Sequence, residues 1–201
     1  MVAIVDYGVG NLMAIQNIIK KVGGESIITS NSSDIQNSDK IILPGVGSFG
    51  YCMQQLQRRN LAPILEEEVF ERKKKILGLC VGAQMMTEES EEGGSKGLGW
   101  VKARTKKFDE TRVDITPHMG WSDVSFQNYL SLGKGMEEAS RFYFVHSYHF
   151  EFYQQEQVLA TCHFGYEFAC AFQLNNIFGV QFHPEKSHRF GMRLFENFLS
   201  L

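Results

Sequence analysis

The amino-acid sequence predicts an α/β fold: an open, largely parallel central sheet flanked by helices, with antiparallel strands at its edge. Two observations support this prediction. In the first half of the chain, short apolar runs alternate with segments of helical periodicity, which is typical of parallel sheets. After about residue 98, aromatic and β-branched runs separated by turn residues dominate, which is typical of antiparallel strands.

The first half opens with the apolar run Val2–Val5, which we expect to form a buried strand. Asn11 then stands where it can cap a helix whose apolar residues recur at a spacing near 3.6, and Gly23-Gly24 ends that helix. A further helical stretch is expected before the fourth strand, which runs directly into Cys80. The second, third and fourth strands are predicted at 26–29, 40–43 and 75–79.

The second half is predicted to add strands and a closing helix. The helix spans Arg189–Leu201, with Met192, Phe195, Phe198 and Leu199 facing inward. No linker, repeat or low-complexity segment interrupts the sequence, so we expect a single domain over residues 1–201. The predicted strands are Arg141–Phe150, Gln157–His163, Phe168–Leu174 and Asn176–Phe182.

Composition narrows the class of protein. The 201 residues are 43% apolar and 21% charged, as in globular proteins, and a net charge of -3 gives no sign of nucleic-acid binding. The apolar run after Met1 is too short for a signal peptide or a membrane span, so we expect a cytoplasmic protein. The four cysteines form no CxxC pair and the six histidines lack ligand spacing, so we expect neither a disulfide framework nor a metal site.

Cys80 is the candidate nucleophile. It ends an apolar strand and lies between Gly78 and Gly82, which permit a sharp strand-to-helix turn that exposes the middle side chain. The amides at the start of the following helix would favour the thiolate. The alternative is a structural cysteine on a plain turn. The other cysteines (Cys52, Cys162 and Cys170) are expected to be inert packing residues.

His183 and Glu185 are the candidate base and its orienting carboxylate. They flank Pro184 at the end of an apolar run, and extended backbone would place both side chains on one side. A carboxylate beside an imidazole fixes its tautomer and stabilises the imidazolium. Alternatively, the motif is a turn with a solvated glutamate. Structural or surface roles are expected for the remaining histidines: His118, His146, His149, His163 and His188.

The segment Pro44-Gly45-Val46-Gly47 follows a buried strand and is a candidate anion hole. Two glycines around one residue let a peptide approach a ligand closely or rotate. Hydrolysis of an amide passes through an oxyanion that needs preorganised N–H donors. The N–H of Val46 or of the adjacent Gly47 would supply one donor and that of Val81 another, although a plain glycine turn is the alternative.

Six motifs occur in one order along the chain and together are strongly specific: Val5–Leu12, Leu43–Gly50, Glu88–Gly99, Pro117–Trp121, Tyr143–Tyr148 and Phe178–Lys186. Through them nearly the whole chain resembles the class I, or triad, glutamine amidotransferases, which have a flavodoxin-like fold. Within that family it is most similar to the glutaminase subunits of imidazole glycerol phosphate synthase. The resemblance implies that Cys80 is the nucleophile, His183 the general base and acid, and Glu185 the orienting carboxylate.

The resemblance also implies a substrate and a partner. The amino-acid end of glutamine would be bound by the side chains of Gln84 and Glu92 and by backbone around Gly45, Gly47, Ser147 and Tyr148. The ammonia released would pass to a β/α-barrel cyclase subunit in a heterodimer, and no cofactor, nucleic acid or membrane is involved. The implied partner interface contains Asn11, Met119, Trp121 and Lys186.

Two departures from the subfamily leave the ammonia acceptor open. Val81-Gly82-Ala83 replaces the more frequent Leu-Gly-Met, and His188-Arg189-Phe190 is unusual after the catalytic motif. Both resemble paralogues that supply ammonia for amidation of surface-polysaccharide sugars. The main hypothesis is synthesis of imidazole glycerol phosphate and aminoimidazole carboxamide ribotide in histidine biosynthesis. Amidation of a surface sugar is the second hypothesis, and a remote third hypothesis is another cysteine hydrolase on a similar scaffold.

Overall fold

Five parallel strands form the centre of the sheet in the computed structural model, which describes residues 1–127, 131–137 and 139–201. Their order is β2-β1-β3-β4-β13, the arrangement of flavodoxin-like folds, and this confirms the predicted α/β class. The strands are β1 (Val2–Val5), β2 (Ser26–Thr29), β3 (Lys40–Leu43), β4 (Lys75–Leu79) and β13 (Ile177–Val180).

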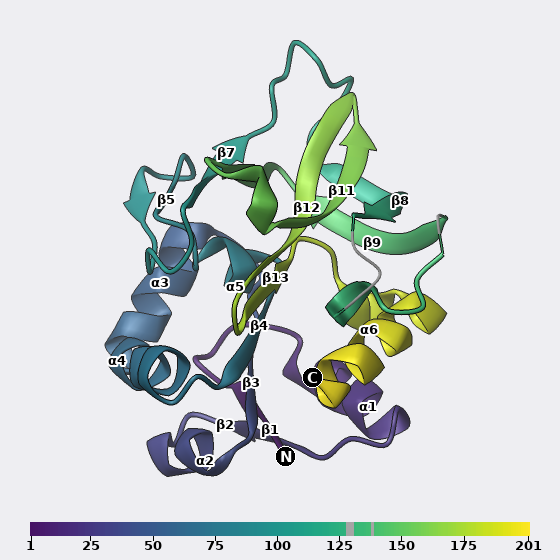
Figure 1. Cartoon of the computed structure of the whole chain (residues 1–201). Coiled ribbons are helices and arrows are strands. Elements are labelled where there is room, and N and C mark those ends of the chain that lie inside the picture. Colours follow the sequence, from purple (N-terminus) through teal and green to yellow (C-terminus); the bar gives the residue numbers. More distant parts are fainter. Residues whose placement is uncertain (128–130, 138) are drawn as a thin grey trace.

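Helices cover both faces of this parallel sheet, as Figure 1 shows. Val2 and Ile4 pack with one group of helices, whereas Ala3 and Val5 belong to the core on the other face, because successive side chains of a strand point to opposite sides. The first group comprises α1 (Leu12–Lys21) and α6 (His188–Ser200). The other helices are α2 (Ser32–Asn37), α3 (Phe49–Arg58), α4 (Ala62–Glu66), the π-helix η1 (Glu67–Glu71) and α5 (Val81–Gln84).

The other strands extend the sheet in two branches from β12 (Tyr166–Leu174), by antiparallel pairing except between β5 and β7, which are parallel. Figure 1 shows β8 and β9 beside the β11–β12 pair. One branch runs through β10 (Tyr148–Phe152), β7 (Ala103–Lys107), β5 (Glu89–Ser90) and β6 (Ser95–Lys96). The other runs through β11 (Val158–Phe164), β8 (His118–Phe126) and β9 (Ser140–His146). The short 3-10 helices η2 (Ser131–Gly133), η3 (Gln155–Gln157) and η4 (Pro184–Lys186) lie between elements.

Three details differ from the sequence-based expectations. The predicted strand Arg141–Phe150 is two strands, because the chain leaves β9 at Ser147 and pairs with β7 instead of β8. β13 was expected among the antiparallel edge strands, but it is parallel to β4 and buried along its whole length. Asn11 occupies the N-cap position of α1, but its side chain accepts no capping hydrogen bond. No helix in the described ranges is long and apolar enough to cross a membrane.

Candidate active site

Cys80 lies in a sharp turn between β4 and α5. Its backbone has φ 52° and ψ −116°, a strained conformation for a residue with a side chain. A Cβ on Gly82 would lie 2.0 Å from the carbonyl oxygen of Leu43, and one on Gly78 would lie 2.6 Å from Cα of Ala83. The turn therefore requires glycine on both sides of Cys80, as the sequence predicts.

His183 and Glu185 meet just beyond the end of β13. Nδ1 of His183 lies 2.9 Å from Oε1 of Glu185, and their side chains are only 4% and 3% exposed. The expected extended backbone was wrong: Pro184 opens the 3-10 turn η4, whose first position suits its fixed φ. The backbone N–H of His183 donates to the carbonyl of Tyr143 over 2.8 Å, so strand β9 fixes the backbone of His183.

The charge state of His183 depends on its two neighbours. Burial by itself would lower the pKa of the imidazole, because the charged form loses water. Hydrogen bonds to Cys80 and Glu185, together with their negative charges, outweigh burial and raise the pKa to about 10. The surroundings therefore favour an imidazolium ring next to Cys80, in contact with a carboxylate on its other side.

Cys80 and His183 both line a cavity of about 420 Å³. Most of the predicted substrate and anion-hole residues also line it, although they come from widely separated parts of the chain. Glu185, which contacts His183, and Gly45 are not among the residues that line it. The cavity is lined by Val46, Gly47, Cys80, Val81, Gln84, Glu92, Pro117, Val145, His146, Ser147, Tyr148, His183 and Lys186.

The glycine loop after β3 is anchored at both ends. The Tyr7 hydroxyl donates to the Pro44 carbonyl over 2.5 Å, and the Cys52 thiol donates to the Val46 carbonyl over 3.3 Å. Gly45 is required by close approach, since a Cβ there would lie 2.2 Å from the nitrogen of Gly82. Cys52 is thus buried, as expected, but it also contacts the loop. Sequence reasoning missed this contact and that of Tyr7, which comes from a distant turn.

The residues predicted to form the anion hole line the cavity, and their backbone N–H groups have no competing partner among the described residues. In the described part of the chain, the backbone N–H groups of Val46, Gly47 and Val81 form no hydrogen bond. Val81 is the first residue of α5, and the first amides of a helix have no partner within it. An oxyanion held between the loop and this helix would find donors from both sides.

Polar groups form the wall beside the nucleophile. Nε2 of Gln84 donates to the Tyr148 carbonyl over 3.1 Å and to Oε1 of Gln181 over 3.0 Å. Nε2 of Gln181 in turn lies 3.7 Å from Sγ of Cys80. Glu92 accepts from the N–H of Phe49 over 2.7 Å, at the start of α3. Gln181 was not predicted, although its polar side chain within a buried strand run is a recognisable signal.

The residues predicted for a partner interface lie at the surface, and one of them, Lys186, also lines the cavity. Met119 and Trp121 on β8 are 62% and 38% exposed, and Trp121 stacks on His188 with ring centres 5.1 Å apart. Nζ of Lys186 lies 5.4 Å above the Tyr143 ring. Asn11 is exposed before α1. The contacts with a partner remain a prediction. Within the described ranges, no three His, Cys, Asp or Glu side chains gather as a possible metal site.

The fold and site define a class of protein. Residues 3–201 match the family Glutamine amidotransferase class-I, so the chain belongs to this family and is a glutamine amidotransferase. Solved structures support the fold. The structure of PurLQS from Thermotoga maritima superposes with a TM-score of 0.77 at 19% identity, covering 99% of this chain and 97% of that one. A glutamine amidotransferase from Thermotoga maritima gives 0.67 at 16% identity, covering 99% and 82%.

Curated relatives are similar over their full length. A protein of Methanococcus maripaludis is 46% identical over 199 residues, covering 99% of this chain and 98% of its own. A protein of Pseudomonas aeruginosa is 43% identical over 201 residues, covering 100% of both. Each is named imidazole glycerol phosphate synthase subunit HisH 2. A relative from Bdellovibrio bacteriovorus, 43% identical with 98% of both chains covered, is named subunit HisH of the same enzyme.

Proposed function

We propose that this chain is the glutaminase subunit of an imidazole glycerol phosphate synthase and hydrolyses glutamine to glutamate and ammonia. The observation that carries the proposal is the contact between Cys80, His183 and Glu185 at one cavity, in a chain similar over its full length to proteins of that name. The same relatives favour the histidine pathway over amidation of a surface sugar.

The reaction begins when the Cys80 thiolate attacks the side-chain carbonyl carbon of glutamine. The carbonyl electron pair moves to oxygen, and the resulting oxyanion accepts hydrogen bonds from the amides of Val46, Gly47 and Val81. The His183 imidazolium gives its proton to the departing nitrogen, so the C–N bond breaks and ammonia leaves a thioester on Cys80. Neutral His183 then takes a proton from water, which attacks the thioester and releases glutamate.

The remaining residues have supporting roles in this proposal. Glu185 accepts a hydrogen bond from the Nδ1–H group of His183 and keeps the ring oriented toward Cys80. Gln84 and Glu92 bind the amino-acid end of glutamine, assisted by the backbone around Gly45, Gly47, Ser147 and Tyr148. These side chains suit the two groups, because Glu92 accepts from an ammonium and an amide donates to a carboxylate.

Ammonia requires a second active site, and we propose that a β/α-barrel cyclase subunit provides it in a cytoplasmic heterodimer. The exposed side chains of Met119 and Trp121 on β8, with Asn11 and Lys186 nearby, form the docking face. Lys186 also lines the cavity, so this face lies where ammonia would leave.

The test is the Cys80→Ala variant in complex with the cyclase subunit. Synthesis of imidazole glycerol phosphate and aminoimidazole carboxamide ribotide with glutamine should disappear, because the thioester cannot form. Synthesis from added ammonium salt should persist at the wild-type rate. Loss of both activities in a folded variant would make Cys80 a structural residue. If the wild-type chain hydrolyses glutamine but supports only a sugar amidotransferase, the glutaminase chemistry stands and the acceptor is wrong.

A further inference from the structure

Two buried histidines lie beside the catalytic residues without belonging to the triad. His118 on β8 faces His146 on β9 in the register of the two strands, and they are 2% and 7% exposed. Nδ1 of His118 lies 3.1 Å from Nε2 of His146. Nε2 of His118 lies 2.8 Å from the Ser122 hydroxyl, and Nδ1 of His146 lies 2.7 Å from the Tyr148 carbonyl oxygen.

The contacts of these rings determine where their protons lie. A carbonyl only accepts hydrogen bonds, so His146 must carry its proton on Nδ1 and accept at Nε2. His118 must then donate from Nδ1 and accept at Nε2, which leaves the Ser122 hydroxyl as the donor. Every hydrogen bond therefore points in one direction, from Ser122 toward Tyr148.

Both rings must be neutral for this arrangement. A second proton on His146 would place a donor at Nε2 opposite the Nδ1 donor of His118. A second proton on His118 would make its Nε2 a donor and reverse the hydrogen bond with the Ser122 hydroxyl. Burial lowers the pKa of His118 to about 4 and lowers that of His146 well below its usual range. The chain of hydrogen bonds is thus intact at neutral pH.

The Tyr148 carbonyl links these histidines to the substrate wall. It accepts from Nδ1 of His146 and also from Nε2 of Gln84, over 2.7 and 3.1 Å. Gln84 lines the cavity and contacts Gln181, which reaches Cys80. Tyr148 begins β10, just after the chain departs from β9, so no strand pairing on the β9 side fixes this peptide. The imidazole of His146 supplies the constraint.

We propose that His118 and His146 are positioning residues: a neutral, directional histidine pair that orients the Tyr148 carbonyl and, through it, the Gln84 amide in the glutamine site. The pair also connects the cavity to β8, whose outward side chains are Met119 and Trp121. Its influence on catalysis rests on the proposed function. Its proton arrangement does not.

The proton arrangement is tested directly by nitrogen NMR on the wild-type chain labelled at histidine. At pH 7 both His118 and His146 should be neutral and protonated at Nδ1, with a hydrogen-bonded Nε2. His163, which is exposed on β11, serves as the internal reference for an unconstrained ring. A proton on Nε2 of His146, or a charged ring, would overturn the assignment. This measurement needs no activity, so it stands apart from any failure of the glutaminase proposal.

The catalytic consequence is tested with matched variants of nearly equal shape. His146→Asn keeps a donor near the position of Nδ1, whereas His146→Leu removes it and leaves the Tyr148 carbonyl with Gln84 alone. The KM for glutamine should rise about tenfold in His146→Leu, as expected for one lost hydrogen bond to a buried acceptor, with a smaller effect on kcat. His146→Asn should recover most of the loss, and His163→Leu should change nothing.

A merely structural role would give a different result. Equal losses in His146→Asn and His146→Leu, or an unchanged KM in folded His146→Leu, would refute the positioning role. His118→Asn and His118→Leu provide a second pair with the same logic, because Asn can still donate to Nε2 of His146. Thermal unfolding of all variants shows which of them are folded, and the wild-type NMR result decides the proton arrangement if none is.

Discussion

The side chain of His183 combines burial with charge, and Glu185 is one reason that it can. The pKa of His183, about 10, requires neighbours whose effect outweighs desolvation, and these are Cys80 and Glu185. Of the two, Glu185 forms no bond to the substrate. Glu185→Gln keeps the shape and removes the charge, so the pKa of His183 should fall. The glutaminase rate should fall about tenfold, less than the about 1000-fold expected for His183→Ala. Carbon or nitrogen NMR titration of the His183 ring in both proteins checks the shift.

The same shift has a consequence for stability. The pKa of His183 is raised in the folded state from an ordinary 6.5 to about 10, so its charged form stabilises the fold. That contribution is complete below pH 6.5 and is lost as the pH rises through 10. The free energy of unfolding of the wild type should therefore exceed that of Glu185→Gln most clearly at about pH 6.5 and just below it, and the difference should shrink as the pH approaches 10. An equal difference at pH 7 and above pH 10 would contradict the coupling of the pair.

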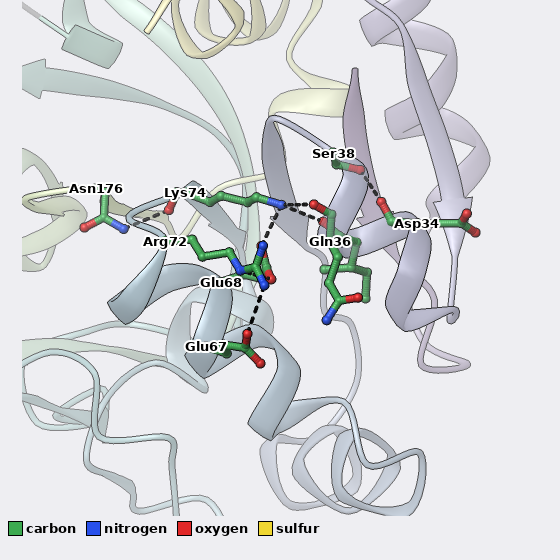
Figure 2. Close-up of polar contacts among 9 residues, drawn as sticks. Asp34, Gln36, Ser38, Glu67, Glu68, Arg72, Lys74 and Asn176 are labelled. Carbon is green, nitrogen blue, oxygen red and sulfur yellow. Dashed lines mark hydrogen bonds and ion pairs between the residues drawn. The ribbon is translucent and has the colours of Figure 1, made fainter.

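At the scale of elements, Lys74 joins three segments at the end of β4 opposite to the end that leads into Cys80 (Figure 2). Nζ of Lys74 lies 2.6 Å from Oε2 of the fully buried Glu68 in η1. It also donates to the carbonyls of Ile35 and Gln36 near the end of α2, over 3.1 and 2.5 Å. Lys74 directly precedes β4, and its own carbonyl accepts from Asn176 over 2.7 Å.

Lys74 provides a partner for the Glu68 carboxylate and for helix carbonyls that have none within their own helix. The last carbonyls of a helix have no partner within it, and a cation near them interacts favourably with the negative end of the helix dipole. Among the described residues, Glu68 pairs with one further cation, Arg72 at 3.0 Å, whose side chain is 53% exposed. The two cations form ion pairs with the Glu68 oxygens but no well-formed hydrogen bonds. The buried carboxylate is therefore stabilised only while both cations are present.

Lys74→Met should therefore destabilise the fold by about 3 kcal/mol, because it strands a buried carboxylate. Urea unfolding of the chain measures the loss. The double variant Glu68→Leu/Lys74→Met should recover part of it, since no buried charge remains. As a surface control, Lys102→Met removes an ion pair whose lysine side chain is 69% exposed and should cost less than about 1 kcal/mol. Equal costs for both lysines would refute the role assigned to Lys74.

The elements also show what sequence patterns reveal. β1, β3 and β4 were predictable because strands buried on both faces appear as continuous apolar runs. β7 and β8 were missed, since their buried residues alternate with polar ones and β8 contains a glycine. The triad was predictable because each part is a local motif, whereas the contacts of His118 and Gln181 join segments far apart in sequence. No local pattern reports such contacts.

At the scale of the molecule, the glycine loop offers a way to couple the cavity to the docking face. The Pro44 and Val46 carbonyls are held by Tyr7 and Cys52, but no hydrogen bond in the described part of the chain holds the peptide between Gly45 and Val46. Glycine accepts backbone angles that other residues avoid, so this peptide can rotate at modest cost. In one orientation its carbonyl faces the developing oxyanion, and in the other its N–H does.

We expect binding of the cyclase subunit and its ligand to favour the donor orientation, which is a shift between two populations. The isolated chain should then hydrolyse glutamine slowly, and the complex should gain mainly in kcat, because one anion-hole donor is worth about 100- to 1000-fold in rate. Val46→Pro removes the N–H and should lower the stimulated rate far more than the basal rate. Val46→Ala keeps the N–H and should be stimulated like the wild type. Steady-state glutaminase assays with and without partner and ligand decide the matter, with ammonia-dependent synthesis reporting that the complex is assembled. Full activity of the isolated chain, or normal stimulation of a folded Val46→Pro variant, would exclude a loop switch and place the coupling elsewhere in the interface.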